Sequence, residues 1–374
     1  MYAAENHIQL LKNNLSNEVW ESGCEWVWQQ IFPLSRDLTG KHSNQTLQTQ
    51  KKWSSINTMD PAYDQYEKAR EFYRTHEYLA WIGEDESDEE TIRSASEEAL
   101  DQSENANSPA NTDSASAKIS DQPMIYPMQQ LMDYDFLMKH FYNVHTSTTA
   151  DRELMNAKNL LSKDLTLEKE DAPQILIYHT HSQESYKNSK KDENVVAVGQ
   201  KLTDLLTEKG WNVYHDTTVY DLAVGKLDRS RAYTYALEGI NEILARYPSI
   251  QVVLDIHRDG VGENVYLKTE IGGQPSARIM FFNGLSQTPE GPISYLANPF
   301  REDNLAFSLK LQLKAEEYYP GFTRKIYLKG LRYNQHLRAR SALVEVGAQT
   351  NTFEEACNAM MPLAELLDMV LQGK

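Results

Sequence analysis

Short apolar runs alternate with helical patterns along the C-terminal two thirds of this 374-residue chain. The first run, residues 174–180 (QILIYHT), is followed by apolar positions at helical spacing from Glu193 to Lys209, and then by Gly210, a residue type common just after a helix. Strands that are apolar throughout and separated by helices indicate a largely parallel sheet covered on both faces. The pattern therefore predicts an α/β fold for residues 123–374.

Five further runs and three further helices complete this pattern. The runs lie at 211–216, 251–257, 277–284, 324–328 and 341–347, and the helices at 230–247, 304–319 and 352–372. The last helix is expected to begin with a capping box, because Thr352 and Glu355 have its spacing.

The N-terminal third has a different composition. Residues 1–83 carry apolar residues at helical intervals, which predicts a helical N-terminal segment. Residues 84–122 hold twelve Asp or Glu against Arg93 and Lys118, with hardly an aliphatic residue, and we interpret them as an acidic disordered linker. This linker carries most of the formal net charge of −17, and an acidic chain argues against nucleic acid as a partner.

Imidazoles and carboxylates lie in or just after three of the apolar runs. His179 lies near the end of the first run, and His181 and Glu184 follow it. His257 ends the run at 251–257, and Glu345 lies in the run at 341–347. Ligands of parallel α/β sheets bind beyond the carboxyl ends of the strands, so these side chains are candidates for one site.

The residue types suit a catalytic zinc ion, which takes three His or carboxylate ligands and keeps a fourth position open. His181 and Glu184, three apart, can reach one ion if the chain turns there, and His257 can supply the third ligand. Glu345 is the candidate general acid/base, since a carboxylate in an apolar strand is costly to bury unless it is paired or employed. It could instead form a structural salt bridge with Arg338 or Arg340.

Other roles near the site stay open at this stage. His179 could replace His181 as ligand if the strand continued, because alternate residues point the same way; otherwise it could support the site or act as a transition-state donor. Asp255 could orient an imidazole ligand or form a structural pair. Arg258 is a candidate substrate-binding residue, although it could also pair with Asp259.

Several separated blocks of the sequence resemble one known family. The stretches IYHTHSQESY, VLDIHRDG and ALVEVGAQTNTFEEA, with the lead-in YDFLMKHFYNVHTSTT, are similar to stage II sporulation protein P, a cell-wall hydrolase of endospore-forming bacteria. The resemblance extends from about residue 130 to residue 374. It implies a zinc amidase-like fold and a Zn²⁺-dependent N-acetylmuramoyl-L-alanine amidase, also associated with endopeptidase activity on peptide cross-links.

The family implies roles for particular residues. His181, Glu184 and His257 would be the metal ligands and Glu345 the general acid/base. Our own hypothesis adds His179 as a donor to the oxyanion. The implied partners, besides peptidoglycan, are a lytic transglycosylase (stage II sporulation protein D) and a membrane scaffold protein. The implied location is the extracytoplasmic face of the forespore septum during engulfment. Family members usually begin with a membrane anchor, which is absent here. We therefore expect either an anchor in a longer natural protein or a different location.

Two other functions compete with the amidase. A zinc carboxypeptidase also has HxxE followed by a distant His and a catalytic Glu, and it would need a cation such as Arg258 to bind the terminal carboxylate of its substrate. A non-catalytic module that binds peptidoglycan is the second alternative. The presence of zinc and the identity of the products distinguish the three.

Overall fold

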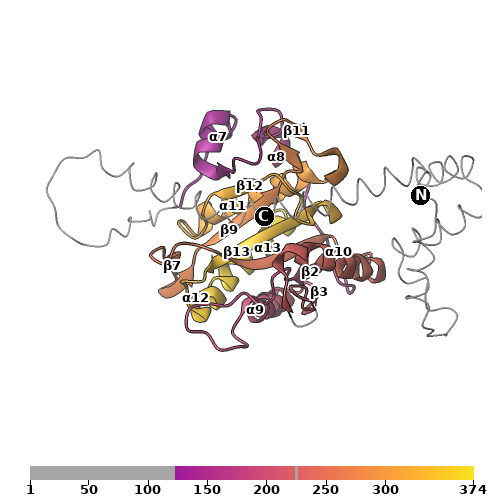
Figure 1. Cartoon of the computed structure of the whole chain (residues 1–374). Helices are drawn as coiled ribbons and strands as arrows, with labels where there is room; N and C mark the ends of the chain where they lie inside the picture. Colours follow the sequence, from indigo (N-terminus) through magenta and orange to yellow (C-terminus); the bar gives the residue numbers. More distant parts are fainter. Residues whose placement is uncertain (1–122, 224–225) are drawn as a thin grey trace, which may run out of the picture. The chain divides into compact units, whose positions relative to one another are not determined.

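The computed structural model describes residues 123–223 and 226–374 (Figure 1). The helical segment predicted for residues 1–83 and the linker predicted for 84–122 lie outside these ranges. Within them, every helix is too short or too polar to cross a membrane.

A seven-stranded sheet forms the centre of the described chain. Its order is β1 (Tyr142–Val144), β12 (Ile326–Lys329), β9 (Ile279–Gly284), β13 (Arg340–Ala348), β6 (Val252–Asp259), β2 (Ile175–Tyr178) and β3 (Val213–His215). The first three strands are parallel to one another, and so are the last four; one antiparallel contact, between β9 and β13, joins the two groups. All six predicted runs supply strands, which confirms the mostly parallel α/β fold, but the reversal at β9 was not predicted.

Helices connect and cover these strands. The long ones are α9 (Val195–Glu208), α10 (Arg229–Arg246), α11 (Arg301–Tyr318) and α13 (Met360–Leu371), and the short ones are α6 (Met128–Leu131), α7 (Tyr134–Phe141), α8 (Ala157–Ser162) and α12 (Phe353–Asn358). The capping box of Thr352 and Glu355 is confirmed, but the single closing helix is in fact two, α12 and α13, which meet at Ala359. Gly210 follows α9 with a φ of 88°, a left-handed conformation that glycine adopts without strain.

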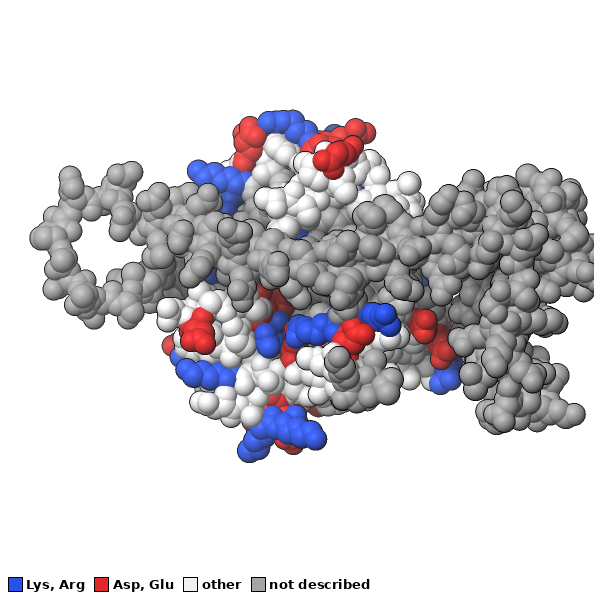
Figure 2. Space-filling view, viewed as in Figure 1, with Lys and Arg blue, Asp and Glu red and all other residues white. Residues whose placement is uncertain are grey.

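Small two-stranded hairpins and two turns of 3₁₀ helix extend from this core. They are β4 (Leu222–Ala223) with β5 (Lys226–Leu227), β7 (Lys268–Ile271) with β8 (Gln274–Ala277), β10 (Gln287–Thr288) with β11 (Gly291–Pro292), η3 (Ser294–Leu296) and η4 (Gln335–Leu337). Over the described residues visible in Figure 2, basic and acidic side chains are interspersed.

One face of the sheet packs against most of the helices. Ile175 and Ile177 of β2 and Val252, Leu254 and Ile256 of β6 join a core formed with α9, α11, α12 and α13 (Figure 1). Because successive side chains of a strand point to opposite faces, the residues between these belong to the other side.

The other face packs against α10. Leu176 and Tyr178 of β2 and Val253 of β6 form a smaller core with Ala236 and Ile240 of that helix. This division decides which polar residues at the strand ends can meet, because an odd and an even position on one strand lie on different faces.

The larger core should dominate the stability of the domain. Phe307 of α11 is fully buried in it, so Phe307→Ala should lower the free energy of unfolding by about 3–5 kcal/mol, the usual effect of emptying a buried aromatic site. Tyr318→Ala, at an exposed position of the same helix, should change it by less than about 1 kcal/mol. Urea unfolding followed by circular dichroism measures both, and equal effects would contradict this packing.

Candidate metal centre

The parallel group of strands brings three polar strand ends to one edge of the sheet. β2, β6 and β13 are neighbours and run in the same direction, so their carboxyl ends lie together. His257 of β6 and Glu345 of β13 are directly paired in this register. Paired residues on neighbouring strands point to the same side, and this is the side covered by α10.

The loop after β2 is held in place by two buried carboxylates. Thr180 donates to Asp255 from its backbone nitrogen (2.9 Å) and its hydroxyl (2.6 Å). Asp221 accepts from the Ser182 hydroxyl (2.7 Å) and the Gln183 backbone nitrogen (3.0 Å). These bonds stop the extended conformation at Tyr178 and turn the chain, so that His181 and Glu184 face the end of β6.

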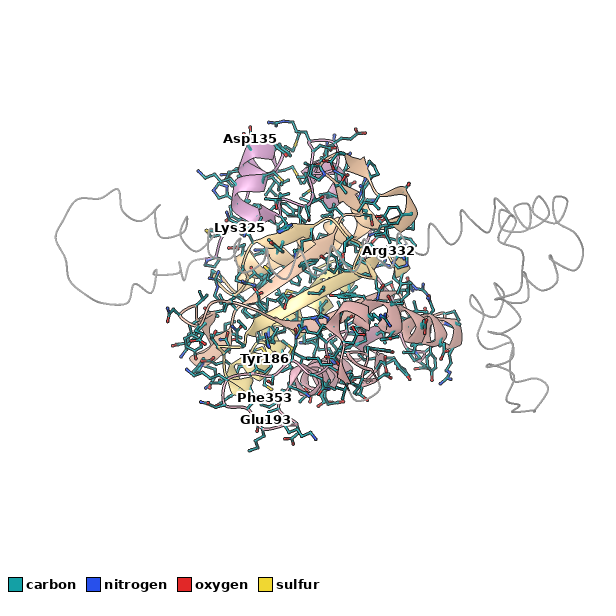
Figure 3. All side chains as sticks on the ribbon, in the orientation of Figure 1. Asp135, Tyr186, Glu193, Lys325, Arg332 and Phe353 are labelled. Atoms are coloured by element: carbon teal, nitrogen blue, oxygen red, sulfur yellow. The ribbon has the colours of Figure 1, made fainter. Side chains whose placement is uncertain are left out.

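Tyr186 fixes the far end of the same loop. Its ring lies near Phe353 of α12, with 6.4 Å between the ring centroids, and its hydroxyl donates to the Val346 carbonyl at 3.3 Å (Figure 3). Ser185 forms an isolated β-bridge with Asn194, which also caps α9. The loop is thus tied to β13 and to two helices.

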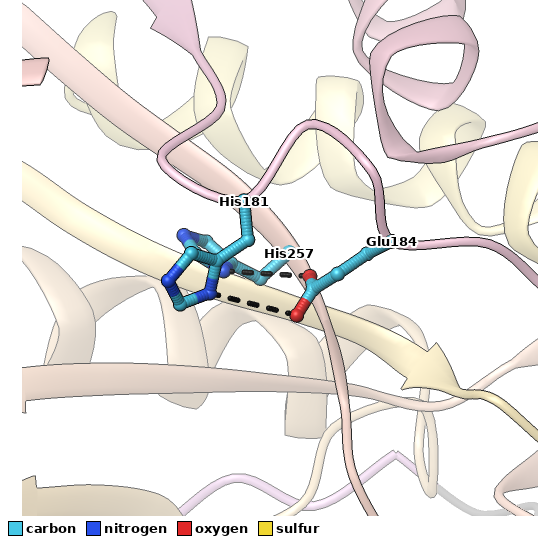
Figure 4. A group of neighbouring side chains, drawn as sticks. All are labelled: His181, Glu184 and His257. Atoms are coloured by element: carbon cyan, nitrogen blue, oxygen red, sulfur yellow. Dashed lines mark ion pairs between the residues drawn. The ribbon is translucent and has the colours of Figure 1, made fainter. Parts of the chain in front are cut away.

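His181, Glu184 and His257 form a buried group whose ligand atoms all lie within 4.8 Å of one another (Figure 4). The two Glu184 oxygens face one imidazole each, with Oε1 at 3.6 Å from His181 Nδ1 and Oε2 at 3.5 Å from His257 Nδ1. Two imidazole nitrogens and a carboxylate that converge in this way can hold a metal ion. The structure therefore groups His181, and not His179, with the other two residues.

Asp255 supports His257 from behind. Its Oδ1 lies 2.8 Å from His257 Nε2, an ion-pair contact without hydrogen-bond geometry. The other ring nitrogen of His257, Nδ1, faces Glu184. A carboxylate behind an imidazole is the usual arrangement at metal sites, where it fixes the ring and raises its basicity. Of the two roles open for Asp255, the orienting one agrees with this contact.

The charges of the group stabilise one another. Burial raises the pKa of Glu184, but its contacts with the His181 and His257 imidazoles and the charge of His257 outweigh it and hold that pKa well below its usual range. Burial lowers the pKa of His257, but Asp255 and then Glu184 raise it well above the ordinary value. Burial lowers the pKa of His181, so this ring is neutral and keeps a lone pair for a ligand.

His179 lies on the opposite face of the sheet. Its Nδ1 lies 3.0 Å from the Ile256 carbonyl and its Nε2 lies 2.9 Å from His215 Nε2, against Gly199 of α9. The strand ends before it, so the alternation that would have aligned it with His181 does not continue. Its predicted role as an oxyanion donor has no support from these contacts.

Arg258 holds the metal loop with both its backbone and its side chain. Its backbone nitrogen donates to Glu184 Oε2 at 3.1 Å, and its guanidinium donates to the carbonyls of Ser185 and Asp259. The Asp259 carboxylate pairs with Arg324 at 2.5 Å rather than with the Arg258 guanidinium. Binding of substrate by Arg258 stays a prediction. The guanidinium would have to give up or share these partners to bind a substrate.

Glu345 is partly buried at the end of β13, and its Oε2 is buried with no hydrogen-bond partner among the described residues. Burial and then the charge of Asp259 raise the pKa of this carboxyl to about 8. Arg338 and Arg340, the alternative partners, donate to the carbonyls of Ile250, Leu337, Leu165 and Thr166. Glu345 is therefore a carboxyl able to exchange a proton near neutral pH, beside the metal group.

Two residues of the site had no signal in the sequence. Arg229, the first residue of α10, places Nη2 2.5 Å from Glu184 Oε1 and 3.1 Å from His181 Nδ1. Asp221, which holds the metal loop, precedes the β4–β5 hairpin. Both lie between the end of β3 and the first turn of α10, a segment whose sequence has no regular pattern that would indicate a site.

The raised pKa of Glu345 makes the stability of the chelated protein depend on pH. The unfolded chain loses this proton near pH 4.5 and the folded chain near pH 8, so wild-type stability should fall across that interval. Glu345→Gln has no proton to lose. The melting temperature of this variant, relative to wild type in EDTA, should therefore rise from pH 5 to pH 8 and then level off. Thermal unfolding measures this, with Glu290→Gln at an exposed turn as the control; a constant difference would contradict the assigned environment.

The solved structures similar to this chain include two amidases. The structure overlaps the CwlD amidase of Clostridioides difficile, solved in complex with the GerS lipoprotein, over 52% of this chain and 99% of that chain, with 15% identity and a TM-score of 0.33. It overlaps the N-acetylmuramyl-L-alanine amidase Ami1 of Mycobacterium smegmatis over 54% and 99%, with 12% identity and a TM-score of 0.33. Overlaps of this extent do not bear on the reaction of this chain.

Comparisons of sequence are more specific. The chain is 28% identical over 214 residues to the stage II sporulation protein P of Bacillus subtilis (strain 168), a match that spans 52% of this chain and 50% of that protein. The family model of stage II sporulation protein P (SpoIIP) matches residues 43–368, so the relationship begins well before residue 130, where the resemblance was expected to start. Because this match includes most of the chain, the protein belongs to the stage II sporulation protein P family.

Proposed function

We propose that this chain is a zinc-dependent peptidoglycan hydrolase that cleaves the amide bond between N-acetylmuramic acid and L-alanine during spore engulfment. The observation that carries the proposal is the convergence of His181, Glu184 and His257 within 4.8 Å, beside a partly buried Glu345 in register with His257. Membership of the sporulation family supports the setting and the substrate class.

The three donors suit zinc better than harder divalent ions. Two imidazoles and one carboxylate are a frequent ligand set of catalytic zinc, whereas magnesium and calcium prefer all-oxygen sites. His257 has Asp255 behind it, as zinc-bound imidazoles usually have. A zinc ion held here would supply Lewis acidity toward the amide carbonyl and make water more acidic.

Glu345 is proposed to move the protons of the reaction. It takes a proton from the attacking water as the oxygen of that water bonds to the lactyl carbonyl carbon, and it returns this proton to the alanine nitrogen as the carbon–nitrogen bond breaks. The products are a lactyl carboxylate on the glycan and a peptide with a free L-Ala amine. A carboxyl whose pKa burial raises toward neutrality suits both steps.

The remaining residues of the site position these groups. Asp221 and Asp255 hold the loop that carries His181 and Glu184, and the Arg258 backbone nitrogen directs Glu184. We assign no reaction step to His179, which lies across the sheet. Cleavage of peptide cross-links remains a second activity that the family association suggests.

The proposed setting is the extracytoplasmic face of the forespore septum. A lytic transglycosylase of the sporulation protein D type would be a fitting partner, because glycan cleavage and stem-peptide removal act on the same polymer. A membrane scaffold protein is the second proposed partner. All three proposals follow from what the resemblance to the family implies.

Removal of the Glu345 carboxylate tests the mechanism. Glu345→Gln should bind zinc as tightly as wild type, because Glu345 is outside the ligand group, but should lose at least about 100-fold in turnover on purified sacculi. Zinc content by atomic absorption and release of peptide from sacculi are the two measurements. Glu290→Gln should keep full activity, and equal turnover of the Glu345 variant and wild type would rule out the assignment.

The products distinguish the amidase from its competitors. Chelation should abolish hydrolysis and zinc should restore it, and mass spectrometry should detect whole stem peptides with a free L-Ala amine. Release of a single terminal residue would instead indicate a carboxypeptidase, for which the engaged guanidinium of Arg258 offers little support. A purified protein without zinc and without hydrolysis would indicate a binding module.

A further inference from the structure

Arg229 places a second cation at the metal group. Its Nη2 lies 2.5 Å from Glu184 Oε1 and 3.1 Å from His181 Nδ1, and these two atoms lie 3.6 Å apart. The Glu184 side chain is 3% exposed, whereas that of Arg229 is 41% exposed. The guanidinium therefore reaches from the protein surface onto two atoms of the ligand group.

Arg229 uses the electron pairs that a metal ion would need. A guanidinium has only donors, so the contact with His181 makes Nδ1 the acceptor. An unprotonated imidazole nitrogen has a single lone pair, which can accept an N–H or bind a metal ion, but not both. The same atom faces Glu184 and would be the ligand, so the observed contact and metal binding exclude each other at Nδ1.

We propose that Arg229 is the counter-ion of Glu184 in the metal-free protein, that zinc must displace it, and that this displacement limits the affinity of the site for zinc. The inference rests on the proposed function, since it assumes that zinc binds His181, Glu184 and His257.

Burial of Glu184 explains why such a counter-ion is needed. A buried carboxylate is unfavourable unless it is paired. Arg229 joins His257 in compensating Glu184. A dication at the group would take over this role, and its charge would repel the guanidinium at such close range.

The position of Arg229 allows it to leave without disturbing the core. It begins α10 directly after Asp228, which caps the helix by accepting from the Arg231 backbone nitrogen. Its side chain is already partly exposed, so it can rotate into solvent while α10 stays packed. Asp221, on the same segment, holds the metal loop through Ser182 and Gln183, which are not ligands, and its contacts can persist in both states.

The test compares two substitutions with opposite expected effects. Arg229→Gln removes the competing cation and should tighten zinc binding by at least about tenfold, the equivalent of one charge-assisted hydrogen bond. Asp221→Asn loosens the metal loop and should weaken zinc binding by about tenfold or more. Arg231→Gln, two residues along α10 and bonded to Asp228, should leave zinc affinity unchanged. Competition titration against a chromophoric chelator measures all three.

Thermal unfolding supplies a readout independent of activity. In EDTA, Arg229→Gln should melt below wild type because Glu184 has lost a counter-ion, and with saturating zinc the two should melt at similar temperatures. Arg229→Lys, which keeps the charge, should stay closer to wild type in EDTA.

The outcomes separate the two proposals. A wild-type chain that binds no zinc overturns the proposed function and this inference with it. If wild type binds zinc and Arg229→Gln binds it equally or more weakly, the counter-ion proposal fails while the zinc site stands. Tighter binding in Arg229→Gln, with a lower melting temperature in EDTA alone, supports displacement.

Discussion

The parallel alignment of β2, β6 and β13 is the constraint on which the rest of the site depends. Hydrogen bonding across these three strands fixes their direction and register, and so places one histidine, one catalytic candidate and the start of the metal loop at one edge. His257 and Glu345 are 88 positions apart in the chain, yet sheet register makes them neighbours. Nothing local to either residue could achieve this, because a strand alone sets only which side chains alternate.

Two buried acids, Asp255 and Asp221, hold the metal loop against the strands. Asp255 accepts from Thr180 and lies against His257, so one carboxylate connects the metal loop and the strand that supplies the other imidazole. Asp221 holds the same loop through Ser182 and Gln183. Such groups are unfavourable in a protein interior unless every charge has a partner, and here the partners are the backbone and side chains whose positions the site requires.

Much of the fold and part of the site could be predicted from the sequence. Apolar runs such as 174–180 and 341–347 are short, unbroken and bounded by helical patterns, so strand positions and a mostly parallel sheet followed from them. The pair His181 and Glu184 could be identified as candidates because their spacing allows one turn to bring them together. The reversal at β9 could not be predicted, since an apolar strand buried on both faces has the same pattern in either direction.

The sequence by itself determined which residues could bind a metal ion and which strands would carry them, because hydrophobic periodicity and ligand chemistry are local properties. Only the tertiary structure decided the rest. His179 lies across the sheet from His181 because the strand ends at Tyr178 and two distant acids, Asp221 and Asp255, turn the chain. Arg229 reaches the group from the start of α10, a contact that no spacing records, because residues remote in sequence meet only once the sheet and its helices have packed.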